Sequence, residues 1–145
     1  IAGLACLTAG CGPDHGDTRR VAKELAFIQS DLGSKHLKQR KYVEAEALLR
    51  SSLKVREQQL PEIWTTFAVR SLLGGALLGQ QKYAEAEPLL VLGYQGMKER
   101  EAEIPANSRA RLTEGLERLV QLYDAWGKAA EAAKWRKLLP AQTDP

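Results

Sequence analysis

The sequence predicts an all-α protein built from about three antiparallel helix pairs. A phrase occurs twice, KYVEAEALL at Lys41–Leu49 and KYAEAEPLL at Lys82–Leu90, with an offset of 82 − 41 = 41 residues. A weaker copy, KAAEAAKW, follows at Lys128–Trp135, 128 − 82 = 46 residues further on. Repeats at such spacings indicate stacked supersecondary units. Apolar residues recur at helical spacing between these copies, and no strand pattern is visible.

Composition and charge narrow the class of protein. A chain of 145 residues has the length of one domain. With 44% hydrophobic and 27% charged residues, the chain as a whole is expected to be neither disordered nor embedded in a membrane. The formal net charge is +3, but basic residues alternate with glutamates and form no basic stripe with aromatics. Nucleic acid is therefore not an expected partner.

The first segment, Ile1–Gly12, carries no charged residue and is too short to span a bilayer. We favour its interpretation as the end of a preceding repeat helix in a truncated sequence. The alternative is the apolar core of an export signal, because Leu7–Cys11, LTAGC, resembles a bacterial lipoprotein cleavage site. Membrane attachment is expected only if Cys11 is lipidated. Cys6 and Cys11 are too few and too close for a disulfide framework.

The predicted organisation is an N-terminal segment and linker at 1–17, a repeat domain at 18–139 and a tail at 140–145. The linker Gly12–Thr18, GPDHGDT, is expected to be a loop in which Asp17 or Thr18 caps the next helix. Six helices are expected, at about 18–39, 42–59, 63–80, 83–101, 107–126 and 129–138. Pro61 ends the second helix and Gly127 ends the fifth, since neither continues a helix well.

Each helix pair follows the same rule. A leucine stands nine residues before each repeated lysine, at Leu32, Leu73 and Leu119. An alanine follows thirteen residues after each leucine, at Ala45, Ala86 and Ala132. Small residues let two helices approach closely, and a larger side chain there would overpack the contact. Gly33 and Gly74 are expected to serve the same close approach.

Leucine, glycine, a helical turn and then Tyr-x-Glu-Ala resembles the tetratricopeptide repeat. The period of about 41, together with the GPDHGDT linker, is similar to the kinesin-light-chain type of this repeat. The last hundred residues also resemble repeat arrays at the C-terminus of certain bacterial serine/threonine protein kinases. The resemblance implies a right-handed superhelix whose concave face, lined by the first helix of each pair, binds a peptide or partner protein.

The geometry of this family implies which residues face the groove, namely those at fixed distances from each aligned leucine. They are Ser30, Asp31, Ser34 and Lys38 in the first pair, Ser71, Leu72, Gly75 and Gly79 in the second, and Glu117, Arg118, Gln121 and Asp124 in the third. Such a surface has a small, apolar centre and ends of mixed charge. It favours a ligand with an apolar centre flanked by charges. Alternatively, Leu72, Gly75 and Gly79 simply pack against a neighbouring helix.

No enzymatic chemistry is expected. The glycine-rich loop, HRD-type loop and DFG of a kinase are not in the sequence. His36 stands where the repeat usually has a packed aromatic, and Asp14, His15 and Asp17 fit a polar turn better than a metal site. No metal or cofactor is therefore expected.

The predicted function is that of a cytoplasmic protein–protein interaction scaffold. Two alternatives stay open, a C-terminal regulatory or recruitment module of a larger bacterial kinase, and a lipid-anchored envelope scaffold. The sequence does not determine the oligomeric state.

Overall fold

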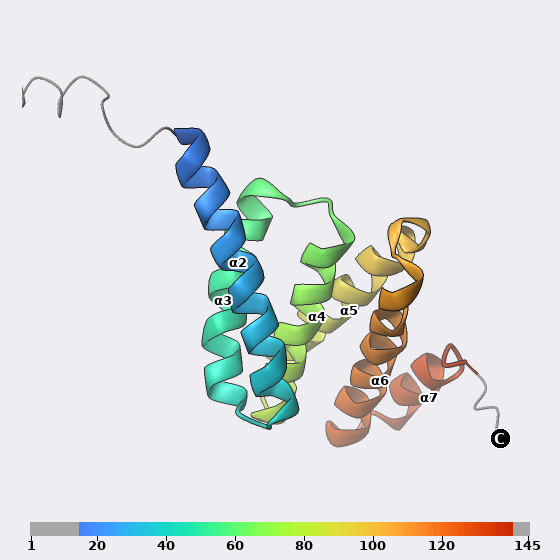
Figure 1. Cartoon of the computed structure of the whole chain (residues 1–145). Coiled ribbons are helices and arrows are strands. Elements are labelled where there is room, and N and C mark those ends of the chain that lie inside the picture. The colour runs from blue at the N-terminus through green and yellow to red at the C-terminus, as the bar shows by residue number, and fades with distance from the viewer. Residues whose placement is uncertain (1–14, 141–145) are drawn as a thin grey trace, which may run out of the picture.

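A computed structural model describes residues 15–140 of the chain, and these residues are almost entirely helical. The helices are α2 (His15–Lys38), α3 (Tyr42–Gln59), α4 (Trp64–Gly79), α5 (Tyr83–Glu99), α6 (Ala110–Ala125) and α7 (Ala129–Arg136). Two short 3-10 turns, η1 (Glu101–Glu103) and η2 (Ala106–Ser108), join α5 to α6, and the described range contains no strand. The helices pack in pairs, α2 with α3, α4 with α5 and α6 with α7, which follow one another along the molecule (Figure 1). The predicted all-α class is confirmed.

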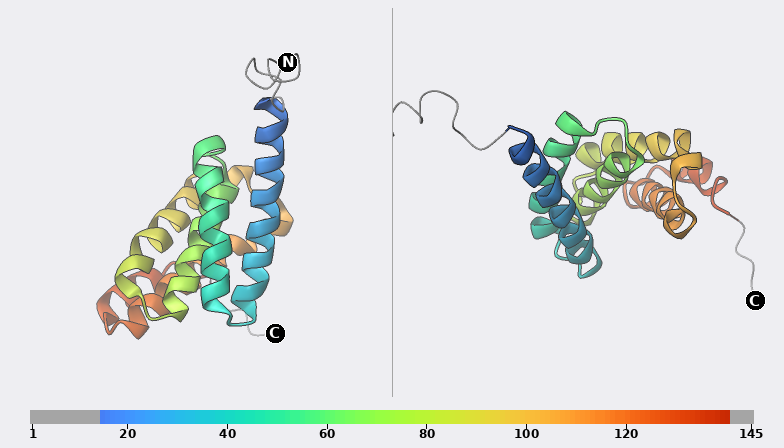
Figure 2. Two further views of the ribbon diagram at one scale, coloured as in Figure 1. Left: turned by 90° about the vertical axis from the view of Figure 1, so that its left-hand side faces the viewer. Right: turned by 45° about the horizontal axis from the view of Figure 1, so that its top comes forward.

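Close approach within each pair depends on small residues, as the sequence predicts. A Cβ atom at Gly33 would lie 2.7 Å from Cγ of Leu49, and one at Gly74 would lie 2.6 Å from Cγ of Leu90. Both distances are too short for real atoms, so a side chain at either position would push the two helices apart. The three aligned alanines, Ala45, Ala86 and Ala132, are completely buried. In the left view of Figure 2, α2 and α3 run side by side along their length.

The turn inside each pair has the same backbone geometry three times. Arg40, Gln81 and Gly127 have φ angles of 59°, 64° and 78°. After each of them, the next N–H reaches back five residues to a helix carbonyl, from Lys41 to His36, from Lys82 to Leu77 and from Lys128 to Tyr123. This is the Schellman pattern of helix ends. The three pairs are therefore in the register that the repeated phrase predicts.

Two boundaries differ from the prediction. Helix α2 begins at His15, so Asp17 lies in its first turn and the predicted loop over Gly12–Thr18 is wrong in its last four residues. Residues 12–14 lie outside the described range. Between α5 and α6, the predicted helix ends at 101 and 107 are replaced by η1 and η2, with Ile104 buried between them. This inserted segment accounts for the longer third period.

The first pair differs from the others in burial. Leu73 and Leu119 are buried, at 1% and 0% exposure, whereas the aligned Leu32 is 41% exposed. Its neighbours on the same helix face are exposed as well, Val21 at 57%, Leu25 at 52% and Ile28 at 64%. Leu32 is therefore less buried than the two leucines aligned with it. The reason is positional, because α4 and α6 pack against a preceding pair and α2 has no described pair before it.

Candidate protein-binding groove

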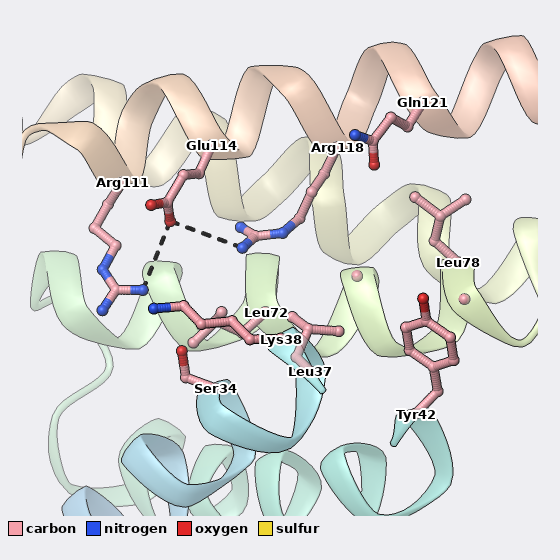
Figure 3. Close-up of a pocket in the computed structure, with 12 residues that line it drawn as sticks. Ser34, Leu37, Lys38, Tyr42, Leu72, Leu78, Arg111, Glu114, Arg118 and Gln121 are labelled. Carbon is pink, nitrogen blue, oxygen red and sulfur yellow. Dashed lines mark ion pairs between the residues drawn. The ribbon is translucent and has the colours of Figure 1, made fainter. Parts of the chain in front are cut away.

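The first helices of the three pairs line a shared open hollow of about 260 Å³. Figure 3 shows α2 on one side, α6 on the other and α4 between them. The lining residues are Ser34, Leu37, Lys38, Tyr42, Leu72, Gly75, Leu78, Gly79, Arg111, Glu114, Arg118 and Gln121. Apart from Tyr42 at the start of α3, all of them belong to α2, α4 or α6. A groove lined by the first helix of each pair is the arrangement that the family resemblance implies.

The centre of the groove is apolar but narrower than its glycines suggest. The Tyr42 ring occupies the space over Gly79, where any Cβ would collide with it. A Cβ at Gly75 would lie 3.1 Å from Cδ of Arg118 and 3.3 Å from Cδ2 of Leu37. Both glycines therefore line the groove and also accommodate neighbouring side chains. Gly75 and Gly79 thus have both properties considered for them, a place in the groove and packing against neighbouring helices.

Positive charge dominates the polar part of the groove. Lys38, Arg111 and Arg118 line this first hollow, with Glu114 as the one acidic residue among its described lining residues. Glu114 Oε2 is shared, at 3.7 Å from Arg111 Nη1 and 3.8 Å from Arg118 Nη2 (Figure 3). Because both contacts are long and one carboxylate serves two guanidinium groups, the groove retains a surplus of positive charge.

Arg118 is held in place by a contact below the groove. Its Nη1 donates a hydrogen bond to Oγ of Ser71 at 3.2 Å. Burial lowers the pKa of Arg118 from its usual value. A guanidinium group nevertheless stays protonated at neutral pH, since its ordinary pKa is far above that pH. The groove thus contains a cation that is fixed in direction and partly shielded from water.

A second hollow of about 200 Å³ continues the groove between α2 and α4. Ser34, Leu72 and Arg111 line both hollows, and Phe27 and Trp64 add aromatic surface to the second. The two hollows therefore form one groove along the first helices.

Arg56 lies beneath this second hollow and is 2% exposed. Its guanidinium group donates to hydroxyl oxygens of Ser30, Ser52 and Thr65, each at 3.1 Å, and stacks on the Phe27 ring with Cζ 4.3 Å from the centroid. Burial lowers the pKa of Arg56 as well. These contacts tie α3 to both α2 and α4, and they place a further cation under the groove.

Most of the groove residues predicted from the sequence lie at this surface. Ser34, Lys38, Leu72, Gly75, Gly79, Arg118 and Gln121 line the first hollow, and Ser30 and Asp31 line the second. Ser71, Glu117 and Asp124 lie outside both hollows. Ser71 is buried below Arg118, and Asp124 accepts a hydrogen bond from Arg136 of α7 at 2.7 Å.

The prediction missed Tyr42, Arg111 and Glu114. Glu114 and Arg111 precede Arg118 by one and two helical turns, so they share its face of α6. This spacing was the available signal for both residues. The same spacing gives no signal for Tyr42, because it begins α3 and does not belong to a first helix of a pair.

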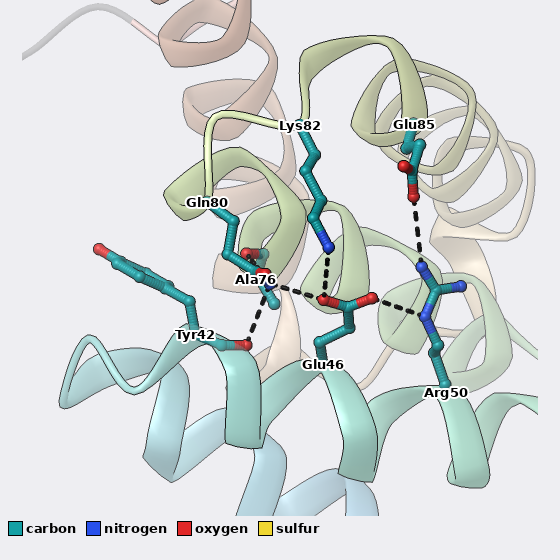
Figure 4. Close-up of polar contacts among 7 residues, drawn as sticks. All are labelled: Tyr42, Glu46, Arg50, Ala76, Gln80, Lys82 and Glu85. Atoms are coloured by element: carbon teal, nitrogen blue, oxygen red, sulfur yellow. Dashed lines mark hydrogen bonds and ion pairs between the residues drawn. The ribbon is translucent and has the colours of Figure 1, made fainter.

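The junction between the first two pairs is polar and positions Tyr42. Figure 4 shows Glu46 of α3 accepting a hydrogen bond from Gln80 at 2.6 Å and one from Arg50 at 2.8 Å, with Lys82 at 3.5 Å. Burial acts to raise the pKa of Glu46, but the hydrogen bonds from Gln80 and Arg50 outweigh it, so the pKa is lower than usual. This network holds the end of α4 on the start of α3.

Comparison with models of known families and with curated proteins found no match. Within residues 15–140, no helix has the length and apolar character needed to cross a membrane. The same range holds no cluster of three or more His, Cys, Asp or Glu residues placed to bind a metal ion. Cys11, the residue of the lipoprotein alternative, lies outside the described residues. The groove is therefore the feature of the described fold from which a function can be argued.

Proposed function

We propose that this protein binds a segment of another protein in the groove along α2, α4 and α6, and that the segment is acidic and apolar. The observation that carries the proposal is the lining of the first hollow, in which an apolar centre meets three cations and one carboxylate, while the second hollow adds the carboxylate of Asp31. Leu37, Leu72 and Tyr42 supply surface for aliphatic or aromatic side chains. Lys38 and Arg111 favour a carboxylate beside them, because opposite charges within a partly shielded groove attract.

We further propose that the three pairs are tetratricopeptide-type repeats arranged in a right-handed superhelix. The equal turn geometry at Arg40, Gln81 and Gly127 supports this, as does the burial of the aligned alanines. In repeat proteins each unit packs mainly on its neighbours, and the stack presents an extended concave surface. The role is that of a scaffold, whether the repeats act alone or as a recruitment module of a larger signalling protein. Cytoplasmic location and the lipid-anchored alternative both remain predictions.

The proposal can be tested with a displayed library of random twelve-residue peptides, selected on the folded protein. The enriched peptides should combine Asp or Glu with Leu, Phe or Trp. Their binding, measured by fluorescence anisotropy, should weaken as salt is added, because salt screens charges in an open groove.

Two variants identify the surface used. Lys38→Glu with Arg111→Glu reverses the charge at the groove and should weaken binding by about tenfold or more, the equivalent of about 1.4 kcal/mol. Lys54→Glu reverses a single charge on the exposed side of α3, outside both hollows, and should leave binding unchanged. Equal loss in both variants, or selection of basic peptides, would contradict the proposal.

A further inference from the structure

The groove carries more positive charge than its own carboxylates can balance. Four cationic side chains line its two hollows, namely Lys38, Arg56, Arg111 and Arg118. The carboxylates among the described lining residues are Asp31 and Glu114. Asp31 is already paired at 2.8 Å with Lys35, which lines neither hollow. Glu114 is therefore the carboxylate that remains to balance the four cations.

Two of these cations are buried, which makes their shortage of counter-charge costly. Arg56 is 2% exposed, and its described side-chain hydrogen bonds all go to hydroxyl groups of serine and threonine. The Arg118 side chain is 17% exposed and comes no closer than 3.8 Å to the carboxylate of Glu114. A charge removed from water loses hydration free energy, and an anion that enters the groove can restore part of it. The groove therefore favours an anionic ligand group over a neutral one.

Hydrogen-bond donors from two helices converge where the hollows meet. Arg111 Nη1 and Arg118 Nη2 lie 3.7 and 3.8 Å from the same oxygen, Oε2 of Glu114. Arg111 lines both hollows, and Figure 3 shows the Lys38 side chain extending from α2 to the side of the groove where Arg111 projects from α6. Each guanidinium group offers five N–H donors and an ammonium group offers three. A ligand group with several acceptor oxygens can therefore be held from both sides of the groove.

We propose that the acidic group recognised here is a phosphorylated serine or threonine of the bound segment, held by Lys38, Arg111 and Arg118. It rests on the proposed function, since the segment has to lie in the same groove. In the first hollow three cations face one carboxylate. A phosphate ester carries a charge of about −1.5 to −2 and three acceptor oxygens at pH 7, whereas Asp or Glu supplies one charge and two oxygens. Phosphate matches both the surplus charge and the donors, so phosphorylation of the partner switches binding on.

The test compares three mixtures of degenerate peptides that differ only in the central residue, which is phosphoserine, Asp or Ser. Each mixture is passed over the folded, immobilised protein, and peptides recovered from it are measured singly by fluorescence anisotropy. Phosphoserine peptides should bind about tenfold or more tightly than the same peptides with Asp. This advantage should be lost as the pH falls from about 7.5 to about 5, because the second pKa of the phosphate is about 6.

Two matched variants locate the phosphate. Lys38→Gln and Lys54→Gln remove the same charge from two exposed lysines, one in the groove and one outside both hollows. Lys38→Gln should reduce the phosphoserine advantage by about threefold or more, and Lys54→Gln should leave it unchanged. Circular dichroism of both variants checks that the helices remain intact.

The possible failures can be told apart. If phosphoserine and Asp peptides bind equally and both bind better than Ser peptides, the phosphate assignment is overturned and the proposed function stands. If the protein retains none of the mixtures, both are overturned. An equal effect of Lys38→Gln and Lys54→Gln would place the phosphate outside the groove. Full competition by inorganic phosphate at the concentration of the peptide would assign the cations to a small free anion instead.

Discussion

Arg40 and Gln81 hold a backbone conformation that glycine adopts more easily. The equivalent residue of the third pair is Gly127, and all three have positive φ angles. For residues other than glycine, asparagine and aspartate, this left-handed region costs about 1 kcal/mol or more. The first two turns therefore keep a strain that the third avoids.

Replacing Gln81 by glycine should raise the free energy of unfolding by about 0.5–1 kcal/mol, since the strain is released while the Schellman bonds remain. Urea unfolding followed by circular dichroism measures the change. Gln95→Gly is the matched control, because Gln95 is exposed in the middle of α5 and glycine there should destabilise by about 1 kcal/mol. A loss of stability in both variants would contradict the backbone strain assigned to Gln81.

Glu46 is expected to make the stability depend on pH. Its pKa is lowered in the folded state, so its contribution is complete above the ordinary pKa of 4.5 and is lost as pH falls through the lower folded value. Glu46→Gln should destabilise at pH 7 by about 1 kcal/mol, and the difference should shrink below about pH 4.5. Glu85→Gln is the control, because this exposed carboxylate lies 3.5 Å from Arg50 and should matter little. A difference that is constant from pH 7 to pH 3 would contradict the expectation.

At the scale of the helices, pairing depends on small residues at the positions where two helices approach each other closely. Ala86 of α5 is fully buried, and Gly74 of α4 leaves room for Leu90, which also belongs to α5. Local helix propensity does not require small residues at these positions, whereas the distance between helices does.

Ala86→Leu should therefore lower the free energy of unfolding by roughly 1–3 kcal/mol through overpacking. Ala84→Leu, the same substitution at an exposed position two residues earlier, should change it by less than about 0.5 kcal/mol. Chemical denaturation of both variants checks the comparison. If Ala86→Leu left stability unchanged, α4 and α5 would not meet as described.

At the scale of the whole molecule, the pairs form a row in which the middle pair has neighbours on both sides (Figure 1). At the C-terminal end, Ala132 is the buried residue within α7. Stability in a row of repeats is the sum of unit and neighbour contributions, so the middle should open last.

Amide hydrogen exchange should accordingly be slowest in α4 and α5 and fastest in α7. Mass spectrometry of peptides from native protein gives the exchange rate of each helix. Comparable protection of α7 and α4 would show that the chain opens as one cooperative unit rather than from its ends.

The helices and their register were predictable because their causes are local. The 3.6-residue apolar period, the buried alanines and Gly127 each act within a few turns of chain. The burial of a helix face has no such local cause. Leu32 and Leu73 have similar sequence surroundings, but only Leu73 is buried, and only Leu73 has a described helix pair before it.

The full lining of the groove also depends on tertiary structure, because it is formed by residues of different helix pairs. The family resemblance implied that Lys38 and Arg118 lie on the groove face, and both line the first hollow. It did not predict that Arg111 joins the two hollows, or that Tyr42 covers Gly79. Such contacts depend on how far each pair is rotated against the next, and this rotation is set by the packing of all the helices together.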